Sequence, residues 1–143
     1  MGRIGQTIII GGAVIFMAFA VIHSLSVDEE ITCVLTEHGV LLQHRESLAS
    51  EGLSVVIPYE QIVSAEVWNS LPRLEREEGR STINSMLGRF RAGSHGEMYL
   101  VVNRREESHV YLRTRDRQQF LFTPTCSEAS DFFRRLNDRM QRR

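Results

Sequence analysis

The sequence predicts a mainly β domain with one C-terminal α-helix, preceded by a single N-terminal transmembrane helix. Three observations predict this class: an unbroken apolar run at Ile8–Ile22, alternation of apolar and polar residues over much of 31–123, and a change to a 3.6-residue period after Pro124. A chain of 143 residues is enough for one domain. We expect about seven antiparallel strands in a bent sheet or barrel, with the helix covering one open end.

Residues 1–27 read as a membrane anchor with its flank. Between Thr7 and Leu25 there is no Asp, Glu, Lys or Arg, and this stretch approaches the ~20 residues that a helix needs to cross a hydrocarbon core. A cleaved signal peptide is the alternative, because Arg3 precedes the run and Ser24 and Ser26 place small residues at a spacing that a signal peptidase accepts. The length of the apolar run is at the upper limit for a signal peptide, which favours the anchor.

The orientation of this anchor depends on the positive-inside rule. Arg3 precedes the apolar run, and no basic residue follows it until Arg45. This distribution favours a domain outside the cell. A cytoplasmic domain is the alternative, because a single arginine carries the signal.

Residues 28–143 form the predicted domain, and seven of its segments have the alternation typical of strands. They are Ile31–Thr36, Val40–Gln43, Leu53–Ile57, Val63–Trp68, Met98–Val102, His109–Thr114 and Gln119–Thr123. Pro58 cannot donate to a β-ladder and therefore ends the third. Residues 69–96 show no clean period and include the charged string LPRLEREEGR, so we predict a long loop there.

The last element is an amphipathic helix predicted over residues 126–140. Its start is indicated by Thr125 and Glu128, which have the spacing of a capping box directly after Pro124. One apolar stripe follows at helical spacing. Its members are Ala129, Phe132, Phe133, Leu136 and Met140. We expect the two phenylalanines to close the open end of the barrel.

The charge of the chain is unevenly distributed, although the net charge is only −1. Residues 26–66 contain eight acidic residues against one arginine, whereas residues 67–143 contain fifteen arginines against ten acidic residues. The near-neutral pI of about 6.5 and the lack of an aromatic and basic platform argue against nucleic acid as the partner.

The sequence contains no signature of an enzyme, a cofactor or a metal. The five histidines have unrelated spacings, and HExxH, nucleophile-elbow and glycine-rich phosphate motifs are absent from the sequence. Cys33 and Cys126 lie far apart without CxxC spacing, so neither zinc nor redox chemistry is indicated. We expect both to be small core residues. One disulfide between them is the alternative in an oxidising compartment.

Three strings, taken in order, carry a resemblance to a known family. They are IPYEQIVSAEVW at Ile57–Trp68, LGRFRAG at Leu87–Gly93, and VYLRTRDRQQFLFTP leading into SEASDFFRRL near the C-terminus. Over roughly residues 31–138 the chain resembles the bacterial PH-like domains, small barrels related in fold to pleckstrin-homology domains. The resemblance implies a bent barrel capped by the helix, and a non-enzymatic binding or assembly module that is often attached to membrane segments in bacteria.

The first hairpin departs from the pattern of lipid-binding PH domains, whose basic hairpin holds inositol phosphates. Here it carries Glu37, His38 and Glu46, with only Arg45 as a basic residue. The resemblance therefore implies the fold but not phosphoinositide binding.

Seven arginines are the candidate binding residues, and two of them lie in LGRFRAGSHG. Arg89 and Arg91 there are flanked by glycines whose backbone N–H groups can face an anion. The alternative is a turn or bulge in which the glycines take positive φ and Phe90 packs inward. We favour this structural interpretation.

The other five arginines form a second candidate. Arg113, Arg115 and Arg117 have the spacing of one face of an extended chain, and Arg104 and Arg105 come from the preceding turn. Together they would make a basic patch for anionic headgroups or ligands. A solvated, salt-bridged face is the favoured alternative, because acidic residues interleave with the arginines. They are Glu106, Glu107 and Asp116.

These observations predict a single-pass protein of the bacterial cell membrane whose domain is a non-enzymatic module for protein–protein interaction or self-assembly. The alternative is a sensor of anionic lipid or ligand that uses the arginines. No small-molecule substrate is indicated.

Overall fold

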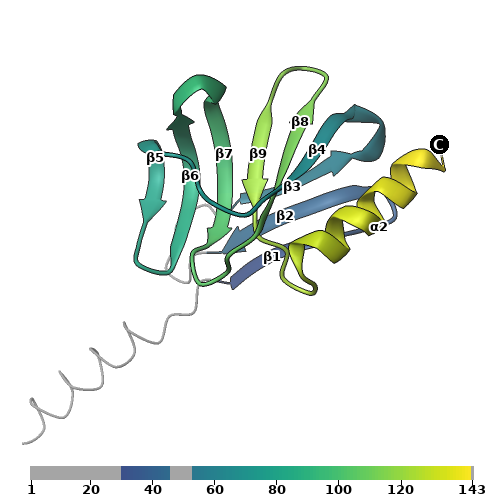
Figure 1. The fold of residues 1–143 in the computed structure, drawn as a ribbon, viewed down its shortest axis with the longest axis horizontal. Helices are drawn as coiled ribbons and strands as arrows, with labels where there is room; N and C mark the ends of the chain where they lie inside the picture. Colours follow the sequence, from purple (N-terminus) through teal and green to yellow (C-terminus); the bar gives the residue numbers. More distant parts are fainter. Residues whose placement is uncertain (1–29, 46–52, 143) are drawn as a thin grey trace, which may run out of the picture.

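The computed structural model describes residues 30–45 and 53–142, which form nine strands in two sheets, two 3-10 turns and one α-helix (Figure 1). The prediction of a mainly β chain with one C-terminal helix is confirmed. The predicted anchor at 1–27 lies outside the described residues. Within the described ranges, no helix combines the length and the apolar composition that crossing a membrane requires.

The smaller sheet contains the first three strands in the order β1-β2-β3, all antiparallel. They are β1 (Glu30–Leu35), β2 (Gly39–Arg45) and β3 (Leu53–Pro58). Thr36 closes the predicted first hairpin, because its backbone N–H donates to the carbonyl of Gly39 at 2.8 Å. Alternation places Cys33, Val40 and Ile57 in the core between the sheets.

The larger sheet has six strands in the order β4-β8-β9-β7-β6-β5. They are β4 (Ile62–Trp68), β5 (Glu75–Ser81), β6 (Ser85–Ala92), β7 (Gly96–Asn103), β8 (His109–Thr114) and β9 (Gln119–Phe122). The 3-10 turn η1 (Tyr59–Gln61) leads into β4, and η2 (Gly93–His95) leads into β7. All pairs are antiparallel except β7 and β9, which run parallel.

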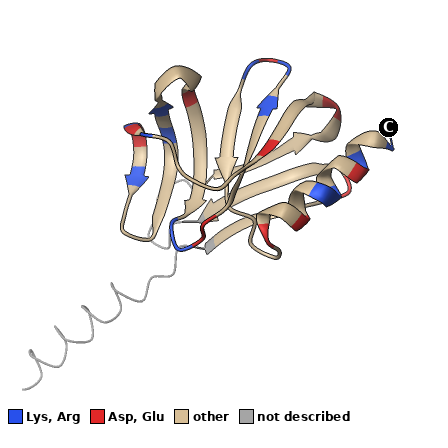
Figure 2. Cartoon of the chain, in the orientation of Figure 1, with Lys and Arg blue, Asp and Glu red and all other residues tan. Residues whose placement is uncertain are grey.

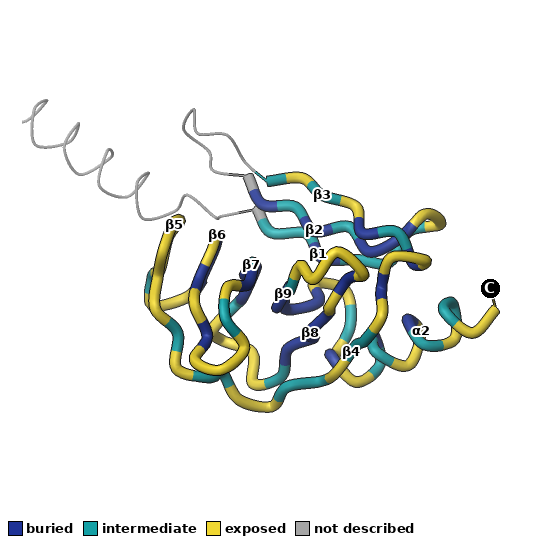
Figure 3. The backbone as a smooth tube through the Cα atoms, turned by 90° about the horizontal axis from the view of Figure 1, so that it is seen from above, coloured by how far each residue is buried: buried dark blue, intermediate teal, exposed yellow. Residues whose placement is uncertain are grey.

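Two expectations are corrected by this sheet. The long loop predicted at 69–96 is wrong, because β5 and β6 occupy most of it. A single antiparallel barrel of about seven strands is also wrong, because the described chain forms two sheets, nine strands and one parallel pair. Figure 3 shows why β5 is hard to recognise from its sequence: it is exposed along its whole length, at the edge of the sheet.

Residues 69–74, here called the strap, connect the two edge strands of the larger sheet by crossing its outer face (Figure 1). Leu71 and Leu74 of the strap, together with Trp68, pack on a second apolar cluster that includes Phe90 and Leu100. The larger sheet therefore has apolar residues on both faces. Its inner face meets the smaller sheet and the helix, and its outer face is covered in part by the strap.

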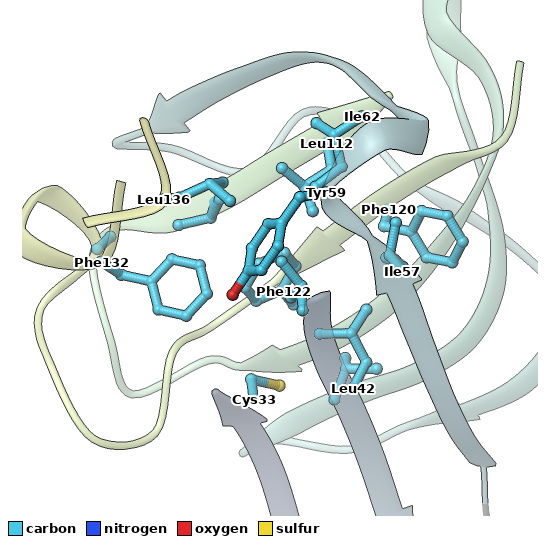
Figure 4. Packing of buried hydrophobic residues seen from close by; sticks show 14 of the residues in the cluster. Cys33, Leu42, Ile57, Tyr59, Ile62, Leu112, Phe120, Phe122, Phe132 and Leu136 are labelled. Atoms are coloured by element: carbon cyan, nitrogen blue, oxygen red, sulfur yellow. The ribbon is translucent and has the colours of Figure 1, made fainter. Parts of the chain in front are cut away.

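The helix α2 (Ala129–Gln141) covers the inner core as expected, starting at Ala129 rather than at 126. Phe132 and Leu136 are buried, and Figure 4 shows both beside Tyr59 and Phe122. Phe133 is only half-buried, so one of the two expected phenylalanines closes the core.

The predicted capping box at the helix start is wrong. Glu128 is the N-cap residue and its side chain makes no capping hydrogen bond. The Thr125 hydroxyl instead accepts from the backbone N–H of Cys33 at 3.1 Å, and the Thr125 N–H donates to the Cys33 carbonyl, also at 3.1 Å. Thr125 therefore fastens the segment before α2 to β1.

The two cysteines are free thiols in different environments, so the alternative of a disulfide finds no support. Cys33 is fully buried, as expected, but Cys126 is exposed, which corrects the expectation of two core residues. Burial raises the pKa of the Cys33 thiol from 9.0 to about 12.

This difference predicts selective labelling. At neutral pH we expect iodoacetamide to modify Cys126 and to leave Cys33 unmodified in the native chain, because the thiolate is the reactive species. Peptide mass spectrometry before and after unfolding in urea measures this. Equal labelling of both cysteines in the native chain would contradict the burial of Cys33.

Candidate functional site

The seven candidate arginines fall into three groups. Arg89 and Arg91 lie on β6, Arg104 and Arg105 in the turn between β7 and β8, and Arg113, Arg115 and Arg117 at the end of β8 and in the turn that follows. Figure 2 shows the basic turn between β7 and β8 at the opposite end of the sheet from the turn after β8, whereas Arg89 and Arg117 line a common hollow. The last two groups, which we expected to form one patch, lie at opposite ends of β8.

The arginines of β6 are paired with glutamates of the neighbouring strands. Arg89 forms ion pairs with Glu78 and Glu97, and the Nη2 atom of Arg91 lies 2.7 Å from the Oε1 atom of Glu77. Hydrogen bonding and charge from these glutamates raise the pKa of both guanidinium groups. Their charge is thus balanced within the sheet.

The structure confirms the favoured interpretation of LGRFRAGSHG as a structural segment with positive-φ glycines and an inward-packed Phe90. Gly88, Gly93 and Gly96 all have positive φ, and Phe90 is buried in the second apolar cluster, on the outer face of the larger sheet. The stretch forms strand β6 and the turn into β7.

The arginines at the end of β8 and in the turn after it line an open hollow of about 510 Å³ at one end of the larger sheet. We call this the arginine hollow, and define it by Arg113, Arg115, Arg117, Ser94, His95 and Gln119. Among the residues that the structure describes, none of these three arginines forms an ion pair. In this respect they differ from the arginines of β6, whose charge is paired with glutamates.

Backbone hydrogen bonds fix the turn that carries two of these arginines. The N–H of Thr114 donates to the carbonyl of Gln118 at 2.9 Å, and the N–H of Arg117 donates to the carbonyl of Thr114 at 3.1 Å. Arg117 takes φ of 67°, which reverses the chain. The N–H of Arg115 donates to the carbonyl of Gln61 at 2.9 Å, so the turn is also tied to η1.

Gln119 joins the two walls of the arginine hollow. Its side-chain Nε2 donates to the carbonyl of His95 and, at 3.1 Å, to the carbonyl of Glu97. Its Oε1 accepts from the Tyr111 hydroxyl at 2.6 Å. The turn before β7 and the turn after β8 are therefore held together by one side chain.

An aromatic cluster lies beside the arginines on the outer face of the sheet. The rings of Trp68 and Tyr111 stack with centroids 4.6 Å apart, and His95 lies 5.0 Å from Trp68. Burial raises the pKa of Tyr111, an effect opposed by Arg113 and reinforced by Glu66. Tyr111 therefore stays a neutral hydroxyl donor, and the cluster gives the hollow a rigid wall.

Two carboxylates lie near these arginines, and both bind neutral groups. Asp116 accepts from the Thr114 hydroxyl, and Glu66 accepts from the Trp68 indole N–H at 2.9 Å. Among the described residues, neither carboxylate forms an ion pair with these arginines. Guanidinium groups match carboxylate and phosphate oxygens in a bidentate geometry.

The sequence had identified three members of this site, and the fold adds the rest. Ser94 and His95 lie in the LGRFRAGSHG stretch, which the sequence does not connect with these arginines, and Gln119 carries no motif. The parallel pairing of β7 with β9 brings their turns together. Among the described residues, no cluster of His, Cys, Asp and Glu suits a metal ion.

Two sheets closed by one C-terminal helix define the class of small β domain to which this chain belongs. Residues 34–140, well over half of the chain, match the family described as Bacterial PH domain. The chain therefore belongs to the Bacterial PH domain family, as its resemblance implied. No curated protein and no solved structure matches it.

Proposed function

We propose that this chain is a membrane-anchored, non-enzymatic binding module whose PH domain holds an acidic segment of a protein partner in the arginine hollow. One observation carries the proposal: Arg113, Arg115 and Arg117 all line one hollow. None of the three has an ion-pair partner among the described residues. The β6 arginines provide the contrast, because glutamates of the same sheet already satisfy them.

The position of the hollow favours a protein partner over the lipid surface. Figure 1 shows β1, where the described chain begins, on the lower side of the domain and the turn between β8 and β9 at the top. The predicted anchor ends at residue 27, and β1 begins at Glu30. So short a connection keeps the β1 side near the bilayer, since each residue spans at most about 3.6 Å. The arginine hollow then faces away from the membrane.

The chemistry of the hollow suits carboxylate side chains on an extended segment. Three guanidinium groups provide bidentate donors, and the Ser94 and His95 side chains line the same space. The rigid aromatic wall beside them lowers the ordering cost of binding. Partners with several neighbouring Asp or Glu residues are therefore expected to bind.

The test uses the full chain in lipid nanodiscs and a fluorescent oligoglutamate peptide. We expect the triple variant Arg113→Gln, Arg115→Gln, Arg117→Gln to weaken binding by at least about tenfold, or 1.4 kcal/mol, because three charge-assisted contacts are lost. Fluorescence anisotropy measures the affinity, and an oligoglutamine peptide of equal length reports binding that is independent of charge.

The matched control is Arg91→Gln, which removes an arginine that is already paired with Glu77. We expect it to bind like the unmodified chain. Equal losses in both variants would mean that only the general charge of the domain matters. Arginine-dependent binding of anionic vesicles without any binding of oligoglutamate would assign the hollow to lipid, which was the alternative from the sequence.

A further inference from the structure

The most exposed large apolar side chain of the described residues is Ile83, at the tip of the turn between β5 and β6. Its side chain is 90% exposed, whereas the next two, Val63 and Val56, are 48% and 45% exposed. An isolated exposed aliphatic residue is ordinary. Two features distinguish Ile83: its turn is held in one shape, and two arginines are bonded to the same turn.

Thr82 holds the turn in one shape. Its hydroxyl accepts from the backbone N–H of Ser85 at 3.0 Å and of Asn84 at 3.2 Å. The Thr82 N–H also donates to the carbonyl of Ser85 at 2.8 Å. Ile83 is thus presented to solvent by a fixed turn and makes no contribution to either apolar cluster.

Two arginines are tied to the same tip. The N–H of Arg104 donates to the carbonyl of Asn84 at 2.8 Å, and the Nε atom of Arg105 donates to the Oδ1 atom of Asn84 at 3.2 Å. The acidic residues of this second turn, Glu106 and Glu107, line a separate hollow beside the start of α2. Arg105 lines that hollow as well, while its Nε atom stays within hydrogen-bond distance of Asn84 at the tip.

This end of the larger sheet is opposite to the arginine hollow. The β5–β6 and β7–β8 turns both lie on the lower side of the domain in Figure 1, as does the start of β1. An apolar tip bonded to two neighbouring arginines, to Arg104 through its backbone and to Arg105 through its guanidinium group, has the composition of a peripheral contact with lipid. In such a contact the apolar group enters the headgroup boundary and the cations meet phosphate oxygens.

We infer that the β5–β6 turn rests on the bilayer, with Ile83 in the headgroup region and Arg104 and Arg105 against lipid phosphates. The inference uses the anchored arrangement of the proposed function but not its ligand. Two contacts, the anchor and this turn, then fix the orientation of the domain relative to the membrane.

The test measures how near this turn comes to lipid in nanodiscs that contain brominated lipids. Ser81→Trp, on exposed β5, places a fluorescent reporter close to the tip, and Ser94→Trp places the matched reporter at the opposite end. Signal from Trp68, the chain's single native tryptophan, is subtracted using the unmodified chain. We expect severalfold greater quenching of the reporter at 81 than of the reporter at 94.

Adding Ile83→Ser to the Ser81→Trp chain is expected to abolish the excess quenching, and adding Arg104→Gln with Arg105→Gln to reduce it most in anionic lipid. Equal quenching at both ends, or quenching at 81 that Ile83→Ser leaves unchanged, would overturn the inference. Oligoglutamate binding should be unaffected by Ile83→Ser, so the proposed lipid contact and the proposed partner site can be disproved independently of each other.

Discussion

Replacing Phe132 with alanine is expected to lower the free energy of unfolding by about 3–5 kcal/mol, the usual cost of deleting a buried phenylalanine. The side chain is 2% exposed and its ring meets Phe122 edge to face, with centroids 5.3 Å apart. Figure 4 shows it at the point where α2 covers the inner core, beside Tyr59. The cavity would open between α2 and the sheets.

Urea unfolding of the detergent-solubilised chain, followed by Trp68 fluorescence, measures this loss. The matched control is Phe133→Ala, which removes the adjacent, half-buried ring and is expected to cost about 1 kcal/mol or less. Equal costs for the two variants would contradict the assignment of Phe132 alone as the residue that closes the core.

Gly88→Ala is expected to destabilise the chain by at least about 2 kcal/mol and to detach the edge strand β5. Gly88 has φ of +120° and faces Gly79 across the β5–β6 ladder. A Cβ atom at Gly88 would lie 2.3 Å from the carbonyl oxygen of Glu78 and 2.7 Å from the Cα atom of Gly79. Both neighbours are backbone atoms, so the strands would have to separate.

Hydrogen exchange of the β5 amides, with the same unfolding measurement, tests this prediction. Gly93→Ala is the control, because Gly93 also has positive φ but a Cβ atom at that position would meet nothing within 4 Å. Its expected cost is only that of the left-handed backbone, about 1–2 kcal/mol. Unchanged exchange in β5 of the Gly88 variant would show that the two strands do not need their close approach.

The sequence predicted most strands because a strand with one buried face alternates visibly. β3 is the clearest case, since Ile57 and its inward neighbours alternate with exposed Ser54 and Val56. β5 and β6 were missed for opposite reasons. All seven residues of β5 are exposed, whereas Ser85–Gly88 of β6 are buried on both faces of the sheet. β5 lacks the period of two that the prediction needs, and β6 shows it only over Arg89–Ala92.

The helix was predictable from its apolar stripe, but its cap was not. Thr125 and Glu128 have the right spacing, yet the hydroxyl of Thr125 bonds to Cys33, which is distant in the sequence. A local pattern does not reveal such a competing tertiary partner.

The candidate site was predictable only in part. The spacing of Arg113, Arg115 and Arg117 is visible in the sequence, but whether an arginine is paired depends on which strand lies beside it. Arg89 and Arg113 look equivalent in sequence, and only the β5–β6–β7 pairing places glutamates beside the first.

The strap constrains how the domain is made on the ribosome. β4 is synthesised before every other strand of the larger sheet, but among the described strands it pairs only with β8. β5, β6 and β7 must therefore emerge before β4 can pair. The hairpins β5–β6 and β6–β7 join neighbours in the chain and can form first. Nascent chains that stall before β8 therefore carry β4 as an open strand edge, the kind of surface that chaperones protect from aggregation.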